Sequence, residues 1–213
     1  MDHNIAKLRQ DYNFKGLHEA DLDSNPLRQF KLWFEEVIKA GISEPNAMLL
    51  STVSTGRPSA RIVLLKDLDH TGFTFFTNYD SKKGKEIEAN PQVALTFFWK
   101  EFERQVRIEG LIEKTTDAES AEYFAVRPRG SQIGAWASDQ SRHVESREAL
   151  EERTQLLEQK FAGAEVPRPP HWGGYRVIPD YMEFWQGRPS RLHDRLVYTK
   201  TADNGWNIER LCP

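Results

Sequence analysis

Two cationic segments of the chain could bind a phosphate group. The first runs from Arg61 to Lys66, and the second, Ser81-Lys82-Lys83, opens a predicted helix. A helix N-terminus holds a phosphate dianion well, because its free N–H groups and dipole favour negative charge and side-chain cations reinforce both. Arg61 and Lys66 lie on opposite faces of a regular strand at this spacing, unless a bulge intervenes. The alternative interpretation is solvated strand ends beside an ordinary basic helix start.

A second candidate anion site surrounds a proline between two predicted helices. Tyr123 and Arg127 are four residues apart, so they would share one helix face. Pro128 would end that helix, and Ser131 would cap the next one. A phenol, a guanidinium and a hydroxyl can together bind an anion, although a plain helix joint with a structural cap explains the pattern equally well.

The third candidate lies near the C-terminus, after Trp185-Gln186-Gly187. On a strand, Arg191, His193 and Arg195 would project from one face, because side chains alternate with a period of two. Crowding of two guanidiniums and an imidazole is typical of a site for an anionic or electron-rich ligand. The alternative is a solvent face whose cations are compensated by Asp194 and nearby acids.

Three neutral polar residues stand in otherwise charged or apolar surroundings, namely Gln105, Gln140 and Ser141. Such side chains can bond the polar edge of a heterocycle. Without a neighbouring site they are ordinary surface residues.

Several classes of function lose their support. The chain has no GxGxxG, GxxxxGK[ST], HExxH or GxSxG motif. Its one cysteine, Cys212, cannot form an internal disulfide, and with six scattered histidines we expect no metal site. The net charge of −3 argues against nucleic-acid and membrane partners. No apolar run approaches the roughly 20 residues that span a bilayer, and the N-terminal sequence lacks a signal peptide's apolar core, so we expect a cytoplasmic protein.

The elements that must position these residues follow from the sequence pattern. Ser24-Asn25-Pro26 begins an amphipathic helix that continues to Gly41. Further helices are predicted over residues 81–88, 116–126 and 144–162. Strands are predicted over residues 47–54, 59–66, 73–78, 93–99, 104–114, 175–185, 195–200 and 205–211.

Strands at this density, joined mostly by short turns, favour an α+β fold in which helices pack outside an antiparallel barrel. The 213 residues contain no repeat, low-complexity tract or linker. We therefore expect a mobile N-terminal arm over residues 1–25 and a single domain over residues 26–213.

The chain resembles the pyridoxine/pyridoxamine 5′-phosphate oxidases, a family of FMN-dependent enzymes, in the segments WQGRPSRLHDR, ARIVLLK and RPRGSQIGAW. The similarity runs from about Leu8 to Pro213, and these segments are far more specific than a short generic motif. The resemblance implies an antiparallel split β-barrel, the FMN-binding split barrel. It also implies a homodimer with a flavin at each of two sites between the subunits.

The resemblance implies a role for each candidate residue. FMN would be bound by Arg61, Ile62, Val63, Leu64, Leu65, Lys66, Phe76, Thr77, Lys82, Lys83, Gln105, Gln140, Ser141, Trp185 and Arg195, some of them from the partner subunit. The substrate would be bound by Lys66, Tyr123, Arg127, Ser131, Arg191, Leu192 and His193, and covered by a segment made of Arg9, Gln10, Asp11 and Tyr12.

The implied reaction makes pyridoxal 5′-phosphate from pyridoxamine or pyridoxine 5′-phosphate, a step of vitamin B6 biosynthesis or salvage. Hydride would pass from substrate C4′ to flavin N5, and O2 would reoxidise the flavin to give hydrogen peroxide, with ammonia released from the amine. We expect positioning to contribute most to the rate. Arg191 and His193 would be the catalytic residues, which orient the group on C4′ and stabilise charge on the pyridine ring.

Three positions depart from the common family pattern. Phe76 stands where tyrosine is frequent, so a hydroxyl is lost. Lys82 stands where arginine is frequent, which keeps the charge and loses the bidentate geometry. The segment from Arg9 to Tyr12 lacks a second arginine that is often present.

Two other functions stay open. Another split-barrel flavoprotein, such as a flavin reductase or a nicotinamide-dependent oxidoreductase, has no use for the RLHDR segment or for the set Tyr123, Arg127 and Ser131. A non-catalytic protein that stores or delivers a phosphorylated vitamin would bind its ligand tightly without consuming oxygen.

Overall fold

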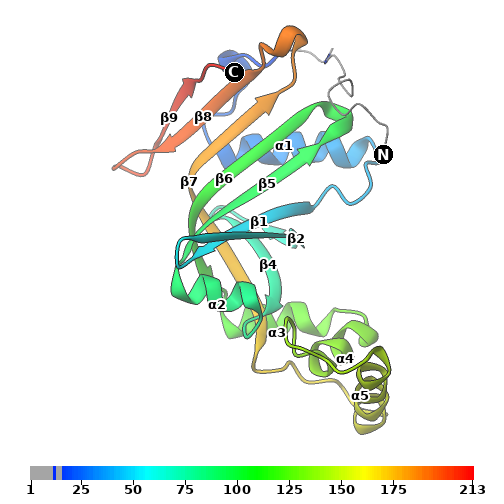
Figure 1. Ribbon diagram of the computed structural model, residues 1–213. Coiled ribbons are helices and arrows are strands. Elements are labelled where there is room, and N and C mark those ends of the chain that lie inside the picture. Colours follow the sequence, from blue (N-terminus) through cyan, green and yellow to red (C-terminus); the bar gives the residue numbers. More distant parts are fainter. Residues whose placement is uncertain (1–11, 13–15) are drawn as a thin grey trace, which may run out of the picture. The chain divides into compact units, whose positions relative to one another are not determined.

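The computed structural model describes Tyr12 and residues 16–213, so the predicted contacts Arg9, Gln10 and Asp11 lie outside the described residues. The helices are α1 (Pro26–Lys39), α2 (Lys82–Ala89), α3 (Asp117–Ala125), α4 (Arg129–Ala137) and α5 (Arg147–Lys160) (Figure 1). The strands are β1 (Ala47–Ser54), β2 (Arg57–Leu64), β3 (Asp67–Leu68), β4 (Phe73–Asn78), β5 (Gln92–Trp99), β6 (Arg104–Lys114), β7 (Trp172–Gln186), β8 (Asp194–Lys200) and β9 (Trp206–Arg210). In the described part of the chain, no helix is long and apolar enough to cross a membrane.

The strands form one sheet in the order β2-β1-β5-β6-β7-β4-β3, and β8 joins β7 to β9. β7 is the longest strand and pairs with three others, namely β6, β4 and β8. Its first part pairs antiparallel with β4, from Trp172 opposite Asn78 to Val177 opposite Phe73. Its last part pairs antiparallel with β8, which pairs antiparallel with β9. All eight predicted strands are present, and only the two-residue β3 is new.

The chain divides into two compact units. The first comprises the described residues up to Leu50, residues 94–110 and residues 179–213. The second comprises residues 51–93 and 111–178. β1, β5, β6 and β7 contribute residues to both units.

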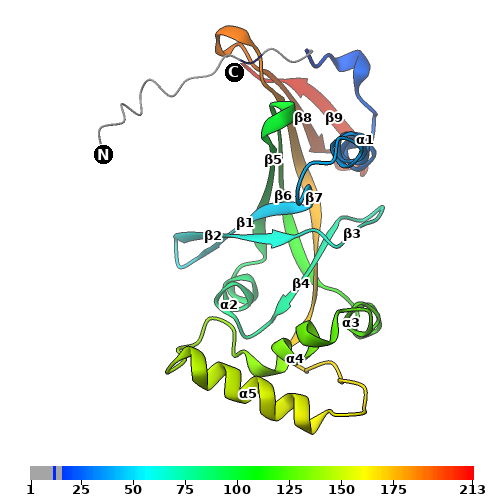
Figure 2. The same cartoon turned by 90° about the vertical axis from the view of Figure 1, so that its right-hand side faces the viewer.

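The aromatic face of α1 organises the core of the first unit. Asn25 accepts hydrogen bonds from the backbone N–H groups of the first turn, and Pro26 occupies the first helical position, as predicted. The Phe30 ring meets Phe97 at 4.8 Å, and the Trp33 ring meets Phe184 at 5.2 Å. α1, seen end-on in Figure 2, therefore covers residues of β5 and β7.

The described part of the N-terminal segment packs against β8 and β9. Leu17 is buried, and its N–H donates to the Asp194 carboxylate at 3.0 Å. The Arg210 guanidinium donates to the Leu17 carbonyl and the Glu19 carboxylate. The Tyr198 hydroxyl donates to the Asp23 carbonyl. The arm expected over residues 1–25 is therefore too long, because residues 17–25 belong to the packed unit.

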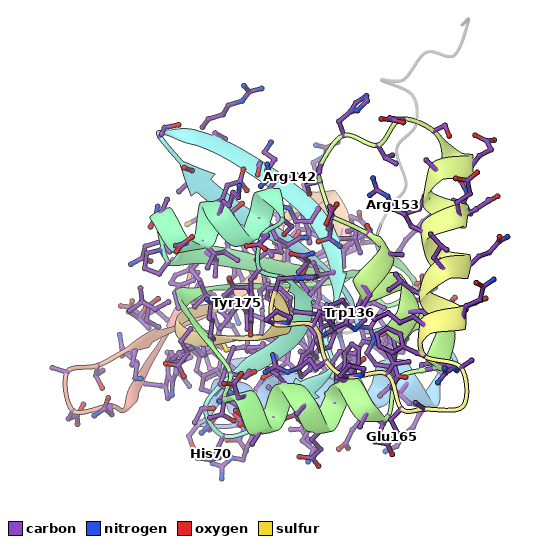
Figure 3. The ribbon with its side chains drawn as sticks, turned by 90° about the horizontal axis from the view of Figure 1, so that it is seen from below. His70, Trp136, Arg142, Arg153, Glu165 and Tyr175 are labelled. Carbon is purple, nitrogen blue, oxygen red and sulfur yellow. The ribbon has the colours of Figure 1, made fainter. Side chains whose placement is uncertain are left out.

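Three helices of the second unit follow β6. Thr116 and Glu119 form a reciprocal capping box at the start of α3, and Ser146 caps α5. Trp136 of α4 points toward α5 (Figure 3), where its ring lies 6.0 Å from Phe161. α3 and α5 lie within the predicted ranges 116–126 and 144–162, with slightly shorter bounds, whereas α4 begins at Arg129, before the predicted cap Ser131.

Candidate active site

A cavity of about 680 Å³ in the second unit gathers most of the residues predicted to bind phosphate. From the predicted set it is lined by Arg61, Ile62, Val63, Leu64, Lys66, Phe76, Thr77, Lys83, Tyr123, Arg127, Ser131 and Gln140. Leu65 and Lys82 are not part of its lining, since Leu65 is buried and the Lys82 side chain is 65% exposed. Ser141 follows Gln140 in a loop, with a left-handed backbone at φ 71°.

Arg61 and Lys66 line the same cavity, which corrects the expectation that they lie on opposite faces. The reason is that β2 ends at Leu64, so the alternation of a strand no longer applies to Lys66. Instead, the Lys66 N–H donates to the Thr74 carbonyl of β4 at 2.8 Å. This pairing of the Lys66 backbone with β4 brings Arg61 and Lys66 to one cavity.

The start of α2 supplies a third cation. Ser81 caps the helix as predicted, since its hydroxyl accepts from the Gly84 N–H. Lys83 Nζ donates to the Thr77 hydroxyl at 3.1 Å and to the Gln140 side-chain oxygen. Burial and the nearby Arg61 charge lower the pKa of Lys83 to about 8, against the opposing effect of Glu86. A bound anion would therefore stabilise the charged form of Lys83.

Arg61 is fixed by a buried carboxylate. Its Nη2 lies 2.8 Å from Glu86 Oε2, and its Nη1 donates to the Thr52 hydroxyl at 2.7 Å. The same Oε2 accepts from the hydroxyls of Thr52 and Ser59, both at 2.7 Å. Burial alone would raise the pKa of Glu86, but these hydrogen bonds and the Arg61 charge lower it to about 2. Glu86 is a neighbour of the cavity that the sequence motifs did not reveal.

A separate group of side chains lies at the joint of α3 and α4. The Arg127 guanidinium stands 4.5 Å from the centre of the Trp172 ring. Its Nη1 is buried and has no hydrogen-bond partner among the described residues. Burial lowers the pKa of Arg127. A buried, unpaired donor is costly, so this group is poised to bind an anion.

The local structure of this joint differs from the prediction. α3 ends at Ala125, so Arg127 lies beyond the helix instead of on a face shared with Tyr123. Pro128 is the N-cap of α4, and its carbonyl accepts from the N–H groups of Ser131 and Gln132. Ser131 therefore lies inside the first turn of α4 and does not cap it. Arg127 and Ser131 nevertheless both line the cavity.

Three near-parallel rings form one wall of the cavity. Phe76 stacks on Tyr123 at 4.0 Å and on Trp172 at 5.5 Å, with interplanar angles of 21° and 11°. Trp172 was missed because its segment, HWGG, carries only turn signals. The phenylalanine at position 76 is thus used for stacking, which needs no hydroxyl.

The predicted C-terminal stripe is wrong. β8 begins only at Asp194, and Arg191 ends a 3-10 turn with a left-handed backbone at φ 60°. Arg191, His193 and Arg195 therefore do not share one strand face. Leu192, between them, is 70% exposed.

His193 belongs to an aromatic cluster in the first unit. Its ring lies 4.7 Å from Trp185, and the Tyr12 ring lies 5.6 Å from it. Its Nδ1 accepts from the Arg188 N–H at 3.1 Å, which leaves the proton of the neutral ring on Nε2. Burial and the Arg191 charge lower the pKa of His193, against the effect of Asp194.

Arg195 is held by a second buried carboxylate, Glu183, which is 2% exposed. The two form a bidentate pair, with Nε–Oε1 and Nη2–Oε2 distances of 2.9 Å. Arg107 of β6 adds a contact to Glu183 at 3.3 Å. Gln105 lies on the same strand, β6, and it also belongs to the first unit.

Two family models match most of the chain. Residues 34–161 match a family model described as pyridoxamine 5′-phosphate oxidase. Residues 172–213 match one described as the pyridoxine 5′-phosphate oxidase C-terminal dimerisation region. A pyridoxine/pyridoxamine 5′-phosphate oxidase from Trichormus variabilis is 56% identical over 214 residues, which is 100% of both chains. One from Ralstonia pickettii is 58% identical over 211 residues, or 99% of each.

Solved structures agree with these matches. PhzG from Burkholderia lata, in complex with tetrahydrophenazine-1-carboxylic acid, is 31% identical with a TM-score of 0.88, over 94% of this chain and 99% of that one. A pyridoxamine 5′-phosphate oxidase-related, FMN-binding protein from Nostoc punctiforme is 16% identical with a TM-score of 0.70, over 90% and 100%, and shows the fold alone. The predicted α+β fold with an antiparallel split barrel is thus confirmed. The chain belongs to the pyridoxine/pyridoxamine 5′-phosphate oxidase family of enzymes.

Proposed function

We propose that the protein uses FMN to oxidise pyridoxamine or pyridoxine 5′-phosphate to pyridoxal 5′-phosphate, with O2 reduced to hydrogen peroxide. The amine substrate would also release ammonia after hydrolysis. The observation that carries this proposal is a single cavity with two separate sets of anion-binding side chains. A reaction between a phosphorylated cofactor and a phosphorylated substrate requires two such sets. The names of relatives at 56% and 58% identity support the same substrate class.

The residues of the first set fit the phosphate and ring of FMN. Lys83 and Arg61 supply cations, and Thr77 and Gln140 supply polar groups beside them. Ile62 and Phe76 give the same cavity apolar walls. FMN, when bound, supplies the two-electron chemistry, since its ring accepts a hydride from substrate C4′ and passes the electrons to O2.

The second set fits the phosphate of the substrate. Arg127 offers its unpaired Nη1, and Ser131, Tyr123 and Lys66 line the same cavity. A guanidinium can bind two phosphate oxygens at once, which orients the substrate as well as holding it. PhzG, whose ligand carries a carboxylic acid, is the more distant relative at 31% identity. Assigning Arg127 to a substrate phosphate therefore favours a phosphorylated vitamin over a carboxylic acid as the substrate.

We propose that Arg191 and His193 act on the ring of a substrate. His193 carries its proton on Nε2 and can donate it in a hydrogen bond to the group on C4′. Arg191 can donate hydrogen bonds that help to orient the ring and the group on C4′. Tyr12 would cover the ring, since it lies against His193 and Trp185.

A homodimer would complete each site. Residues 172–213 match a dimerisation region. Gln105, Trp185 and Arg195, three further predicted flavin contacts, would reach a cofactor bound by the partner subunit.

Two measurements test the proposal. The purified protein should show the yellow spectrum of a flavin, and it should form hydrogen peroxide with pyridoxine 5′-phosphate. A colourless protein that FMN cannot reconstitute would overturn it. Ligand binding without oxygen consumption would favour the storage protein, and oxidation of a nicotinamide cofactor without vitamin turnover would favour a flavin reductase.

The affinity of the apo-protein for FMN should fall as the pH rises above about 8. Lys83 attracts the phosphate only in its charged form, and its pKa in the empty site is about 8. A bound phosphate raises that pKa, so binding takes up a proton and is lost as the pH rises from the lower pKa toward the higher one. Quenching of flavin fluorescence between pH 6.5 and 9 should show the Kd rising about tenfold per unit above pH 8.

Lys83→Arg is the matched control for this pH dependence. Arginine stays charged throughout the range, so the Kd of that variant should stay nearly constant. A flat profile for the unmodified protein would show that Lys83 does not contact the phosphate.

Arg191→Ala should lower kcat at least about tenfold while FMN stays bound, because the substrate loses a residue that orients its reacting group. Steady-state peroxide formation gives kcat, and the flavin absorbance of the same sample gives FMN content. Lys200→Ala, which removes an exposed cation of β8, is the control and should keep full activity. Unchanged turnover in Arg191→Ala would remove the proposed catalytic role.

A further inference from the structure

Glu86 is a buried carboxylate surrounded by the cations of the first anion-binding set. Its Oε2 accepts from Thr52, Ser59 and Arg61 at 2.7, 2.7 and 2.8 Å. Its Oε1 lies 3.8 Å from Lys82 Nζ, one helical turn earlier. Glu86 therefore joins α2 to β1 and β2 through groups that flank the cavity.

The cations around this carboxylate repel one another. Lys82 and Lys83 are consecutive on α2, and the Arg61 charge is close enough to Lys83 to lower the pKa of that lysine. Glu86 has the opposite effect and raises the pKa of Lys83. The two cations that line the cavity, Arg61 and Lys83, and this carboxylate carry a net charge of +1, so a phosphate group of about −1.5 to −2 is still attracted.

A buried ion pair is weak support for stability, because desolvation offsets most of the attraction. Stability alone therefore does not explain the presence of a carboxylate at this position. It keeps its charge throughout the working range, since the hydrogen bonds from Thr52, Ser59 and Arg61 outweigh burial and hold the pKa of Glu86 at about 2. Glu86 thus acts as a constant negative charge beside a lysine that titrates.

We propose that Glu86 is a positioning residue of the phosphate site, which holds Arg61 in the cavity wall and offsets the mutual repulsion of Arg61 and Lys83. The inference rests on the proposed function, because the phosphate in question is that of FMN. Glu86 does not touch the ligand in this role. It acts through Arg61 and Lys83, which line the cavity.

Glu86→Gln tests this role, because glutamine keeps the shape and can still accept hydrogen bonds from Thr52 and Ser59. Titrations of the apo-protein with FMN and with riboflavin, which lacks the phosphate, should be made at pH 6.5 and pH 8. We expect the Kd for FMN to rise about tenfold at pH 8 and less than about threefold at pH 6.5, where Lys83 stays protonated. The Kd for riboflavin should not change.

Two further variants separate this role from a structural one. In a Lys83→Arg background, Glu86→Gln should lose its pH dependence, because arginine does not titrate. Thr52→Val removes one hydrogen bond of Glu86 and one of Arg61 and keeps every charge, so it should lower Tm without moving the pH profile. If Glu86→Gln does not fold, Glu86→Asp takes its place, and its shorter side chain should shift the profile in the same direction by a smaller amount.

The outcomes are distinct. Equal losses of FMN and riboflavin affinity at both pH values would mean a purely structural role and would overturn the proposal. An unchanged Kd for FMN at pH 8 would also overturn it, while leaving the proposed function intact. If the unmodified protein binds FMN no better than riboflavin at any pH, the proposed function fails, and the role of Glu86 fails with it.

Discussion

Replacing Arg127 by methionine should lower kcat/KM for pyridoxine 5′-phosphate about 100-fold, mostly through KM, and leave FMN bound. Arg127 Nη1 is buried without a partner among the described residues, so a substrate phosphate would make a charge-assisted hydrogen bond there. Such a bond contributes about 1.5–3 kcal/mol, and about 1.4 kcal/mol corresponds to a tenfold change. Steady-state kinetics with pyridoxine 5′-phosphate and with pyridoxine measures the effect, because the preference for the phosphorylated substrate should collapse.

Ser131→Ala is the matched control in the same cavity. It removes a neutral hydroxyl, whose hydrogen bond contributes about 1 kcal/mol, so a loss of about fivefold is expected. The apo-form of Arg127→Met should be as stable as the unmodified protein or more so, because a buried guanidinium with an unpaired nitrogen is costly in the empty site. An unchanged KM in Arg127→Met would place the substrate phosphate elsewhere.

Gly84→Ala should destabilise the protein by at least about 3 kcal/mol and abolish FMN binding. A Cβ at this position would lie 1.8 Å from the Tyr79 carbonyl oxygen and 2.5 Å from its carbon. Both are backbone atoms, so α2 must shift away, and Lys83 and the Ser81 cap would shift with it. Urea unfolding measures the free energy change, and flavin absorbance after dialysis measures retained FMN.

Gly130→Ala, in the first turn of α4, is the control for Gly84→Ala. Apart from its chain neighbours and the backbone of its own helix, no described residue lies within 4 Å of a Cβ there, so alanine should stabilise the protein by up to about 1 kcal/mol through its higher helix propensity. Native stability and full FMN content in Gly84→Ala would show that α2 can move without loss of the site.

The secondary structure could be predicted from the sequence where local chemistry decides it. The Asn25 cap with Pro26, the Ser81 cap and the alternating strands depend on residues within one turn or one pairing, and all are present. The errors arose at the ends of strands, because strand alternation no longer decides the direction of a side chain there. Lys66 lies just past the end of β2, and His193 just before the start of β8, so strand alternation gave the wrong face for each.

The partners of the site residues could not be predicted. Glu86 is 25 residues from Arg61, and Trp172 is 45 residues from Arg127. No period or motif links positions so far apart, since only the folded sheet and its helices bring them together. The resemblance supplied the residues that would touch ligands, whereas the side chains that hold those residues became visible only in the structure.

The first part of the described chain to be synthesised is among the last to be fixed in place. Leu17 and Asp23 are held by Asp194, Tyr198 and Arg210, which are translated nearly 200 residues later. A growing chain can complete the second unit, whose last residue is 178, before these partners exist. The segment from Leu17 to Asp23 therefore docks only after β8 and β9 have been made, so loss of the last strand during translation would also remove the Arg210 contacts that hold Leu17 and Glu19.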